Sequence, residues 1–151
     1  MIHFKLLDSS DLETIVKMMK AFYAIDNYTF DVEIATKLLI EFLSNENFGK
    51  CWLILEDEKT IGYVILTFVF SFEYKGKIAF VDECYIDETF RGQGIGKTTI
   101  QFIQKEAKEL SLKLLYLEVE NHNEIAQKMY LSQNFEFHNR RFMKFDVLNV
   151  F

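Results

Sequence analysis

Apolar and polar residues recur along this chain with two different periods, and the longer period predicts helices. Apolar side chains three and four residues apart predict one helix that begins near Ser10 and a second that Asp31 can cap. Ser10 and Glu13 have the spacing of a capping box at the first of these starts. The two apolar stripes are Leu12, Ile15, Val16, Met19, Phe22 and Tyr23, and then Ile34, Leu38, Leu39 and Phe42.

Runs rich in β-branched and aromatic residues predict the strands. Five strands are expected at 3–7, 51–55, 61–70, 78–86 and 114–119, and two more helices at 94–110 and 125–131. A final hairpin is expected from strands 135–138 and 141–147. The order β-α-α-β-β-β-α-β-α-β-β predicts an α/β fold, in which helices cover both faces of one mixed sheet. The absence of repeats and linkers predicts a single domain over 1–151.

Length and charge restrict the class of protein. At 151 residues, half of them hydrophobic, the chain can form one well-buried core. A net charge of −6 argues against nonspecific nucleic-acid binding and mildly favours a cationic partner. No apolar run reaches 18 residues and no signal peptide is recognisable, so we expect a cytoplasmic protein that binds no membrane. Cys51 and Cys84 lie in apolar runs and are expected to be reduced thiols.

Three of the six glycines, Gly92, Gly94 and Gly96, fall within five residues between a predicted strand and a predicted helix. Glycine permits a left-handed backbone, and the first N–H groups of a helix have no partner within it. These features predict a site for an anion such as a diphosphate, although a tight turn that uses glycine for packing is an equal alternative. The lead-in to Gly96-Lys97-Thr98 is wrong for a P-loop, and the glycine spacing is wrong for a dinucleotide fingerprint.

The loop resembles the cofactor loop of the GCN5-related N-acetyltransferase (GNAT) family. Its motif is Gln or Arg, two residues, Gly, one residue, then Gly or Ala, and Arg91, Gly94 and Gly96 match every fixed position. The preceding acidic-x-Tyr-Val-like run of the family is matched by Glu83-Cys84-Tyr85-Ile86. Glu88 departs from the family, many members of which carry proline there.

A second motif of the family is Asn, two residues, Ala, three residues, then Tyr. Asn123, Ala126 and Tyr130 match it. Asn134 stands before Phe135 where Gly-Phe is common, and this is a mild change because Asn also adopts the left-handed conformation.

The resemblance implies the acyl-coenzyme A N-acyltransferase fold, with a mostly antiparallel sheet. Two parallel strands, here 78–86 and 114–119, would splay apart around acetyl-coenzyme A, and no metal is implied. The pantetheine arm would pair with backbone near Tyr85 and Ile86, and the diphosphate with N–H groups from Gly92 to Lys97. The implied cofactor-binding residues are Tyr85, Ile86, Arg91, Gly92, Gln93, Gly94, Ile95, Gly96, Lys97 and Asn123. Capping of its helix is an equal alternative for Asn123.

Acetyl transfer to an amine needs a proton acceptor and a donor for the departing thiolate. By motif position Tyr130 matches the family's donor, with a core aromatic as the alternative. Asp82 and Glu83 are the candidate bases, and a carboxylate in so apolar a strand is expected to have a raised pKa. Because adjacent strand residues point to opposite faces, only one of them should reach the site, and Glu83 is preferred. A backbone N–H of the splayed strand would polarise the thioester carbonyl.

The segment that joins the two N-terminal helices lines the acceptor pocket in relatives. The corresponding residues here are Tyr23, Asp26, Tyr28 and Phe30, with ordinary packing as an equal alternative. The chain is therefore predicted to acetylate a primary amine of a small molecule, such as a polyamine or an aminoglycoside, or of a peptide or protein. A homodimer is an open alternative to a monomer. The competing function is a non-catalytic acyl-coenzyme A sensor or interaction module, against which the retained Tyr130 and an available acid argue.

Overall fold

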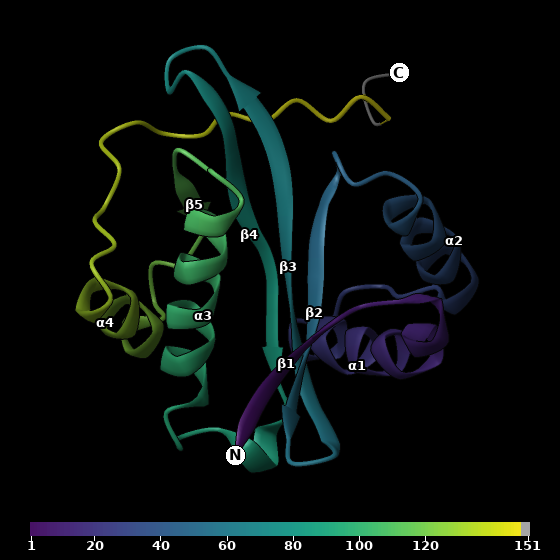
Figure 1. Ribbon diagram of the computed structural model, residues 1–151. Coiled ribbons are helices and arrows are strands. Elements are labelled where there is room, and N and C mark those ends of the chain that lie inside the picture. The colour runs from purple at the N-terminus through teal and green to yellow at the C-terminus, as the bar shows by residue number, and fades with distance from the viewer. Residues whose placement is uncertain (149–151) are drawn as a thin grey trace.

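The computed structural model describes residues 1–148 and contains one five-stranded sheet in the order β1-β2-β3-β4-β5 (Figure 1). The strands are β1 (Ile2–Leu6), β2 (Gly49–Glu56), β3 (Lys59–Ser71), β4 (Gly76–Ile86) and β5 (Leu115–Leu117). Neighbouring strands are antiparallel except β4 and β5, which are parallel. The predicted mixed, mostly antiparallel sheet is confirmed.

Helices cover both faces of the sheet (Figure 1). Helices α1 (Leu12–Ile25) and α2 (Val32–Leu43) lie on one face, and α3 (Ile95–Glu109) and α4 (Glu124–Ser132) lie on the other. Two short 3-10 turns, Ser9–Asp11 and Glu88–Phe90, precede α1 and α3. The sheet is thus the middle layer of three, as the order of elements predicted.

Alternate residues of the central strands supply the two cores. On β3, Tyr63 and Ile65 pack against α1 and α2, whereas Val64 and Leu66 pack against the α3 side. The helices complete each core with the faces that their periodicity predicted, for example Ile15 of α1.

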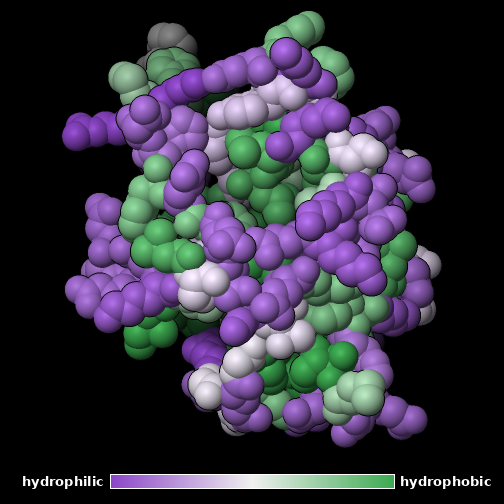
Figure 2. Space-filling view, turned by 60° about the vertical axis from the view of Figure 1, so that its left-hand side comes forward, coloured by the Kyte–Doolittle hydropathy of each residue, from purple (hydrophilic) through white to green (hydrophobic). Residues whose placement is uncertain are grey.

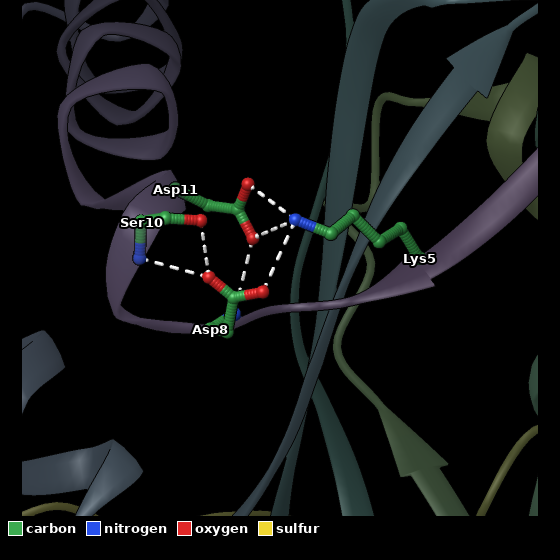
Figure 3. A network of polar contacts seen from close by, with 4 residues as sticks. All are labelled: Lys5, Asp8, Ser10 and Asp11. Carbon is green, nitrogen blue, oxygen red and sulfur yellow. Dashed lines mark hydrogen bonds and ion pairs between the residues drawn. The ribbon is translucent and has the colours of Figure 1, made fainter.

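The capping box at the start of α1 differs from the predicted pair Ser10 and Glu13. It is formed two residues earlier, where Asp8 accepts from the Ser10 N–H at 2.8 Å and Asp11 accepts from the Asp8 N–H at 3.1 Å (Figure 3). The Lys5 ammonium lies 2.7 Å from the Asp11 carboxylate and joins β1 to this turn (Figure 3). The reason for the shift is the 3-10 turn, which places the extended N-cap residue at Asp8.

The predicted C-terminal hairpin is wrong, because 135–138 and 141–147 form no strand. After α4 the chain runs across the end of the sheet instead (Figure 1). Side chains hold it there: the Tyr116 hydroxyl lies 2.9 Å from His138 Nε2, and Arg140 pairs with Glu73. Since β5 pairs with β4 over only three residues, it offers a short edge for a further strand.

None of the helices within residues 1–148 combines the length and the apolar character needed to cross a membrane.

Candidate active site

A β-bulge at Asp82 shapes the middle of β4. Ile65 of β3 pairs with Glu83 and Leu66 pairs with Val81, so Asp82 has no cross-strand partner. The bulge reverses the alternation of β4: Val81 and Cys84 both pack on the α3 side, although they are three residues apart.

Because of this bulge, both carboxylates of β4 line one pocket. The expectation that Asp82 and Glu83 point to opposite faces is wrong, since the extra residue cancels the strand period between them. The sequence could not reveal this, because the bulge depends on the register of β4 against β3.

The shared pocket has a volume of about 310 Å³ and lies between the sheet and helices α1 and α2. Strands contribute Ile65, Thr67, Asp82 and Glu83 to its lining. The rest includes Met19 and Tyr23 of α1, Phe30 of the segment between the two helices, and Ile34, Leu38 and Phe42 of α2. Of the four predicted acceptor-pocket residues, Tyr23 and Phe30 are in this lining, with ring centroids 5.4 Å apart. Asp26 and Tyr28 are outside it, and Tyr28 is largely exposed.

The pocket also explains why two apolar residues of the α2 stripe are exposed. Leu39 is buried and Phe42 half-buried as predicted, but Ile34 and Leu38 are 57% and 58% exposed. Both line the pocket, so their exposed apolar surface faces an opening rather than a filled core. Helical periodicity found this face of α2 but could not show that part of it is open.

Glu83 is 7% exposed, and its carboxylate is the most strongly perturbed acid of the pocket. Burial, and then the negative charge of Asp82, raise the pKa of Glu83 to about 7. Hydrogen bonds from Tyr23 and Tyr63 act in the opposite direction, and the Tyr63 hydroxyl lies 3.5 Å from Glu83 Oε1. Burial also raises the pKa of Asp82. A pKa near 7 suits a group that accepts a proton at neutral pH.

Beyond the bulge, one backbone edge of β4 is unpaired. The parallel ladder between β4 and β5 runs from Ala79 to Val81 and stops there. Within the described residues, 83–86 pair only with β3 and Asp82 pairs with neither neighbouring strand, so Glu83 stands where the two parallel strands separate. Free N–H and C=O groups on such an edge can pair with an extended ligand.

The glycine loop at the end of β4 is open above its backbone. Gly92 and Gly94 have φ of +75° and +80°, and a Cβ added to either would meet no described atom within 4 Å. Gly94 is the N-cap of α3, so the free N–H groups of that helix begin at this loop. The conformation and the free space fit a diphosphate held by backbone groups.

Some of the polar side chains around this loop already form hydrogen bonds within the protein. Arg91 Nε donates to the Ile86 carbonyl at 2.8 Å, and its guanidinium lies over the Tyr85 ring. Asn123 caps α4 by accepting from the Ala126 N–H at 3.1 Å. Lys97 and Gln93 are exposed beside the loop.

Tyr130 lies on the opposite face of the sheet from Glu83. Its ring packs on the α3-side core, 5.8 Å from Phe135, and burial followed by the nearby Cys84 thiol raises its pKa to about 12. A phenol with this pKa stays protonated at neutral pH. Asn134, at the end of α4, has φ of +66°, the left-handed conformation expected of it.

Both cysteines are free thiols. Cys51 is buried and Cys84 is half-buried. Burial is the main cause that raises both pKa values, that of Cys84 to about 12.

A second, larger hollow of about 970 Å³ lies between α3, β5, α4 and the C-terminal segment. Hydrophobic residues form its floor and hydrophilic residues surround it in Figure 2, and its lining includes Leu115, Leu117 and Tyr130. The glycine loop and the two carboxylates of β4 are outside this lining.

Comparison with known proteins identifies the family. Residues 15–135 match the family model described as "Acetyltransferase (GNAT) family". The chain is 23% identical over 130 residues to the D-amino-acid N-acetyltransferase HPA3 of Saccharomyces cerevisiae, with 83% of this chain and 80% of that protein covered.

Solved structures with the same fold include the following two. The integron cassette protein HFX_CASS3 from the mobile metagenome of Cole Harbour Salt Marsh has a TM-score of 0.86 at 25% identity, covering 95% of this chain and 90% of the other. A predicted acetyltransferase from Clostridium acetobutylicum, solved with acetyl-CoA, has a TM-score of 0.80 at 18% identity, covering 98% and 97%.

The fold and the family match define an acyltransferase that transfers acetyl groups and uses acetyl-coenzyme A as co-substrate. The chain belongs to the GNAT family.

Proposed function

We propose that this acetyltransferase moves the acetyl group of acetyl-coenzyme A to a primary amine that enters the pocket between α2 and β4. The observation that carries the proposal is the Glu83 carboxylate, which is buried in this pocket, has a pKa of about 7, and lies at the point where β4 and β5 separate. A buried base beside an unpaired strand edge supports proton removal from an amine next to a bound thioester.

The co-substrate supplies an activated acetyl group as a thioester. The unpaired edge of β4 at 82–86 would hold its pantetheine arm, and the open backbone from Gly92 to Lys97 would hold its diphosphate. A free N–H of the same edge would stabilise the negative charge that develops on the carbonyl oxygen.

Glu83 and Tyr130 would divide the proton transfers between the two faces of the sheet. Glu83 accepts one proton from the ammonium, and the freed amine forms the C–N bond as the C–S bond breaks. Tyr130 donates a proton to the departing sulfur and recovers one that the nitrogen loses when it becomes an amide. The products are an N-acetylated amine, free coenzyme A and the proton held by Glu83. This division agrees with a carboxyl of pKa about 7 and a phenol of pKa about 12.

The test is a screen of primary amines with acetyl-coenzyme A, read as release of free thiol and confirmed by the mass of the acetylated product. The proposal expects amine-dependent thiol release that Glu83→Gln strongly reduces. Tight binding of acetyl-coenzyme A without turnover of any amine would contradict it and would favour a sensor.

A further inference from the structure

The pocket of Glu83 has an unusual lining for a site that receives a charged substrate. Among its described lining residues there is no Lys, Arg or His. Its acids are Asp31, Asp82 and Glu83, and the Asp31 Oδ1 accepts the N–H of Ile34 at 2.9 Å as the cap of α2. Two of the three carboxylates are therefore adjacent on β4, where they form the strongest attraction for a single cation.

The rest of the lining is mainly apolar. Met19, Phe30, Ile34, Leu38 and Phe42 line the pocket together with the two carboxylates. Ile34 and Leu38 keep more than half of their surface exposed, so a bound apolar group would remove that surface from water. The geometry fits one ammonium at β4 with an apolar body against α2.

We infer that the acceptor is a small primary amine that carries one apolar group and no carboxylate, an inference that rests on the proposed function. The volume of about 310 Å³ equals that of about ten water molecules in the liquid, so the group that fills it has roughly ten non-hydrogen atoms. An aromatic ring on a short alkyl chain has this size and can pack against Tyr23 and Phe30.

The same lining disfavours the other amine classes. A free carboxylate on the substrate would meet Asp82 and Glu83 with no cation to offset it, which argues against amino acids. A polyamine or an aminoglycoside has several ammonium groups far apart, and beyond the two carboxylates of β4 the lining offers them mainly apolar side chains and a single acid, the capping residue Asp31. The acceptor of this chain therefore differs from the D-amino acid named for its yeast relative.

The experiment compares kcat/KM for amines that differ in one feature. 2-Phenylethylamine and phenylalanine differ only by a carboxylate, and we expect the first to be favoured on the order of 100-fold, the effect of an uncompensated like charge. Butane-1,4-diamine, an aminoglycoside and a peptide with N-terminal Phe complete the panel, and each should be a poorer substrate than 2-phenylethylamine. Preference for any of these, or for phenylalanine, would overturn the inference.

Two arginine variants of α2 test whether this pocket determines the preference for an amine without a carboxylate. Leu38→Arg places a cation in the lining, and Ile40→Arg places one on the same helix outside it, at a residue that is 54% exposed. Leu38→Arg should narrow the ratio of 2-phenylethylamine to phenylalanine by about three- to fivefold, as expected of a solvent-exposed ion pair, and Ile40→Arg should leave it unchanged. If the ratio of kcat/KM for 2-phenylethylamine to that for phenylalanine is the same in both variants, this pocket is not the acceptor site.

The outcomes separate this inference from the proposed function. Turnover of carboxylated or polycationic amines with loss of activity in Glu83→Gln would leave the proposed function standing and overturn only the acceptor class. Binding of acetyl-coenzyme A by calorimetry with turnover of no amine in the panel would overturn both.

Discussion

Asp82 and Glu83 are consecutive residues of β4, yet their carboxylates share one pocket because the bulge leaves Asp82 without a partner on β3. Their proximity has an electrostatic consequence, since the charge of Asp82 is the second cause, after burial, that raises the pKa of Glu83 to about 7. If Glu83 is the base, Asp82 therefore acts as a modulator of its pKa rather than as an alternative base.

The pH profile of kcat/KM should report the ionisation of Glu83. If Glu83 is the base, activity rises with pH until its carboxyl is ionised, which gives a limb with an apparent pKa of about 7. Glu83→Gln should lower kcat/KM about 100- to 10,000-fold in this range, and less at high pH where the amine arrives unprotonated. A limb that persists unchanged in Glu83→Gln would assign it to another group.

Asp82→Asn should shift this limb without abolishing activity. Removal of the negative charge beside Glu83 lowers the pKa of Glu83, so the limb should move to lower pH. The measurement is the same pH profile, with the exposed Glu46→Gln as a charge-matched control that leaves the limb in place. A large loss of activity at all pH values with no shift would instead make Asp82 the base.

Glu83 should also make the stability of the fold depend on pH. Its carboxyl has a pKa of about 7 in the folded state against 4.5 for an ordinary glutamate, so between these values the folded protein holds a proton that the unfolded chain releases. The free energy of unfolding should therefore fall as pH rises from about 4.5 through 7. Glu83→Gln removes this loss and should be more stable than the parent at pH 8, by up to about 3 kcal/mol, with little difference near pH 4. Urea unfolding of the parent and the variant at pH 4 and pH 8 measures this difference in the free energy of unfolding.

Tyr130→Phe keeps the ring and removes the hydroxyl, so Tm should change little. With an accepted amine, kcat should fall by about 100- to 10,000-fold while calorimetry shows cofactor binding retained. Tyr28→Phe is the matched control, since Tyr28 is exposed and outside the pocket. A kcat equal to that of the parent would leave Tyr130 as a core residue only.

The glycine loop can be tested at two positions with different backbone demands. Gly94→Val forces a β-branched residue to φ of +80° and should lower the free energy of unfolding by about 1–3 kcal/mol. A loss of cofactor binding in this variant could then result from the loss of stability. Gly94→Asn tolerates that conformation, so it should fold normally but place a side chain in the open space and abolish acetyl-coenzyme A binding. Gly96→Ala is the control, because its Cβ would lie at ordinary distances of 3.8 Å and 3.9 Å from Ile86 and Met129. Unchanged affinity in Gly94→Asn would remove the loop from the cofactor site.

Periodicity in the sequence was sufficient for the layers of the fold. The spacing of Ile15 and Val16 located the buried face of α1, and the β-rich run at 61–70 located β3. These features depend on neighbours along the chain, and a local pattern can therefore reveal them.

The features that sequence reasoning missed depend on distant parts of the chain. The bulge at Asp82 arises from the register of β4 against β3, and the exposure of Leu38 arises from the space between α2 and the sheet. The hairpin expected at the C-terminus was wrong for the same reason, since its strands need an edge longer than β5 provides. Tertiary placement decides each of these, and no local pattern records it.

The raised pKa values of the Cys51 and Cys84 thiols have a practical consequence. Thiolates are the reactive form of cysteine, and at neutral pH both side chains remain thiols. Chromogenic disulfide reagents that detect the free thiol of coenzyme A should therefore not react with the folded protein. The absorbance in such an assay then measures released coenzyme A alone. Slow labelling of Cys84 would then signal that β4 and its surrounding helices have opened.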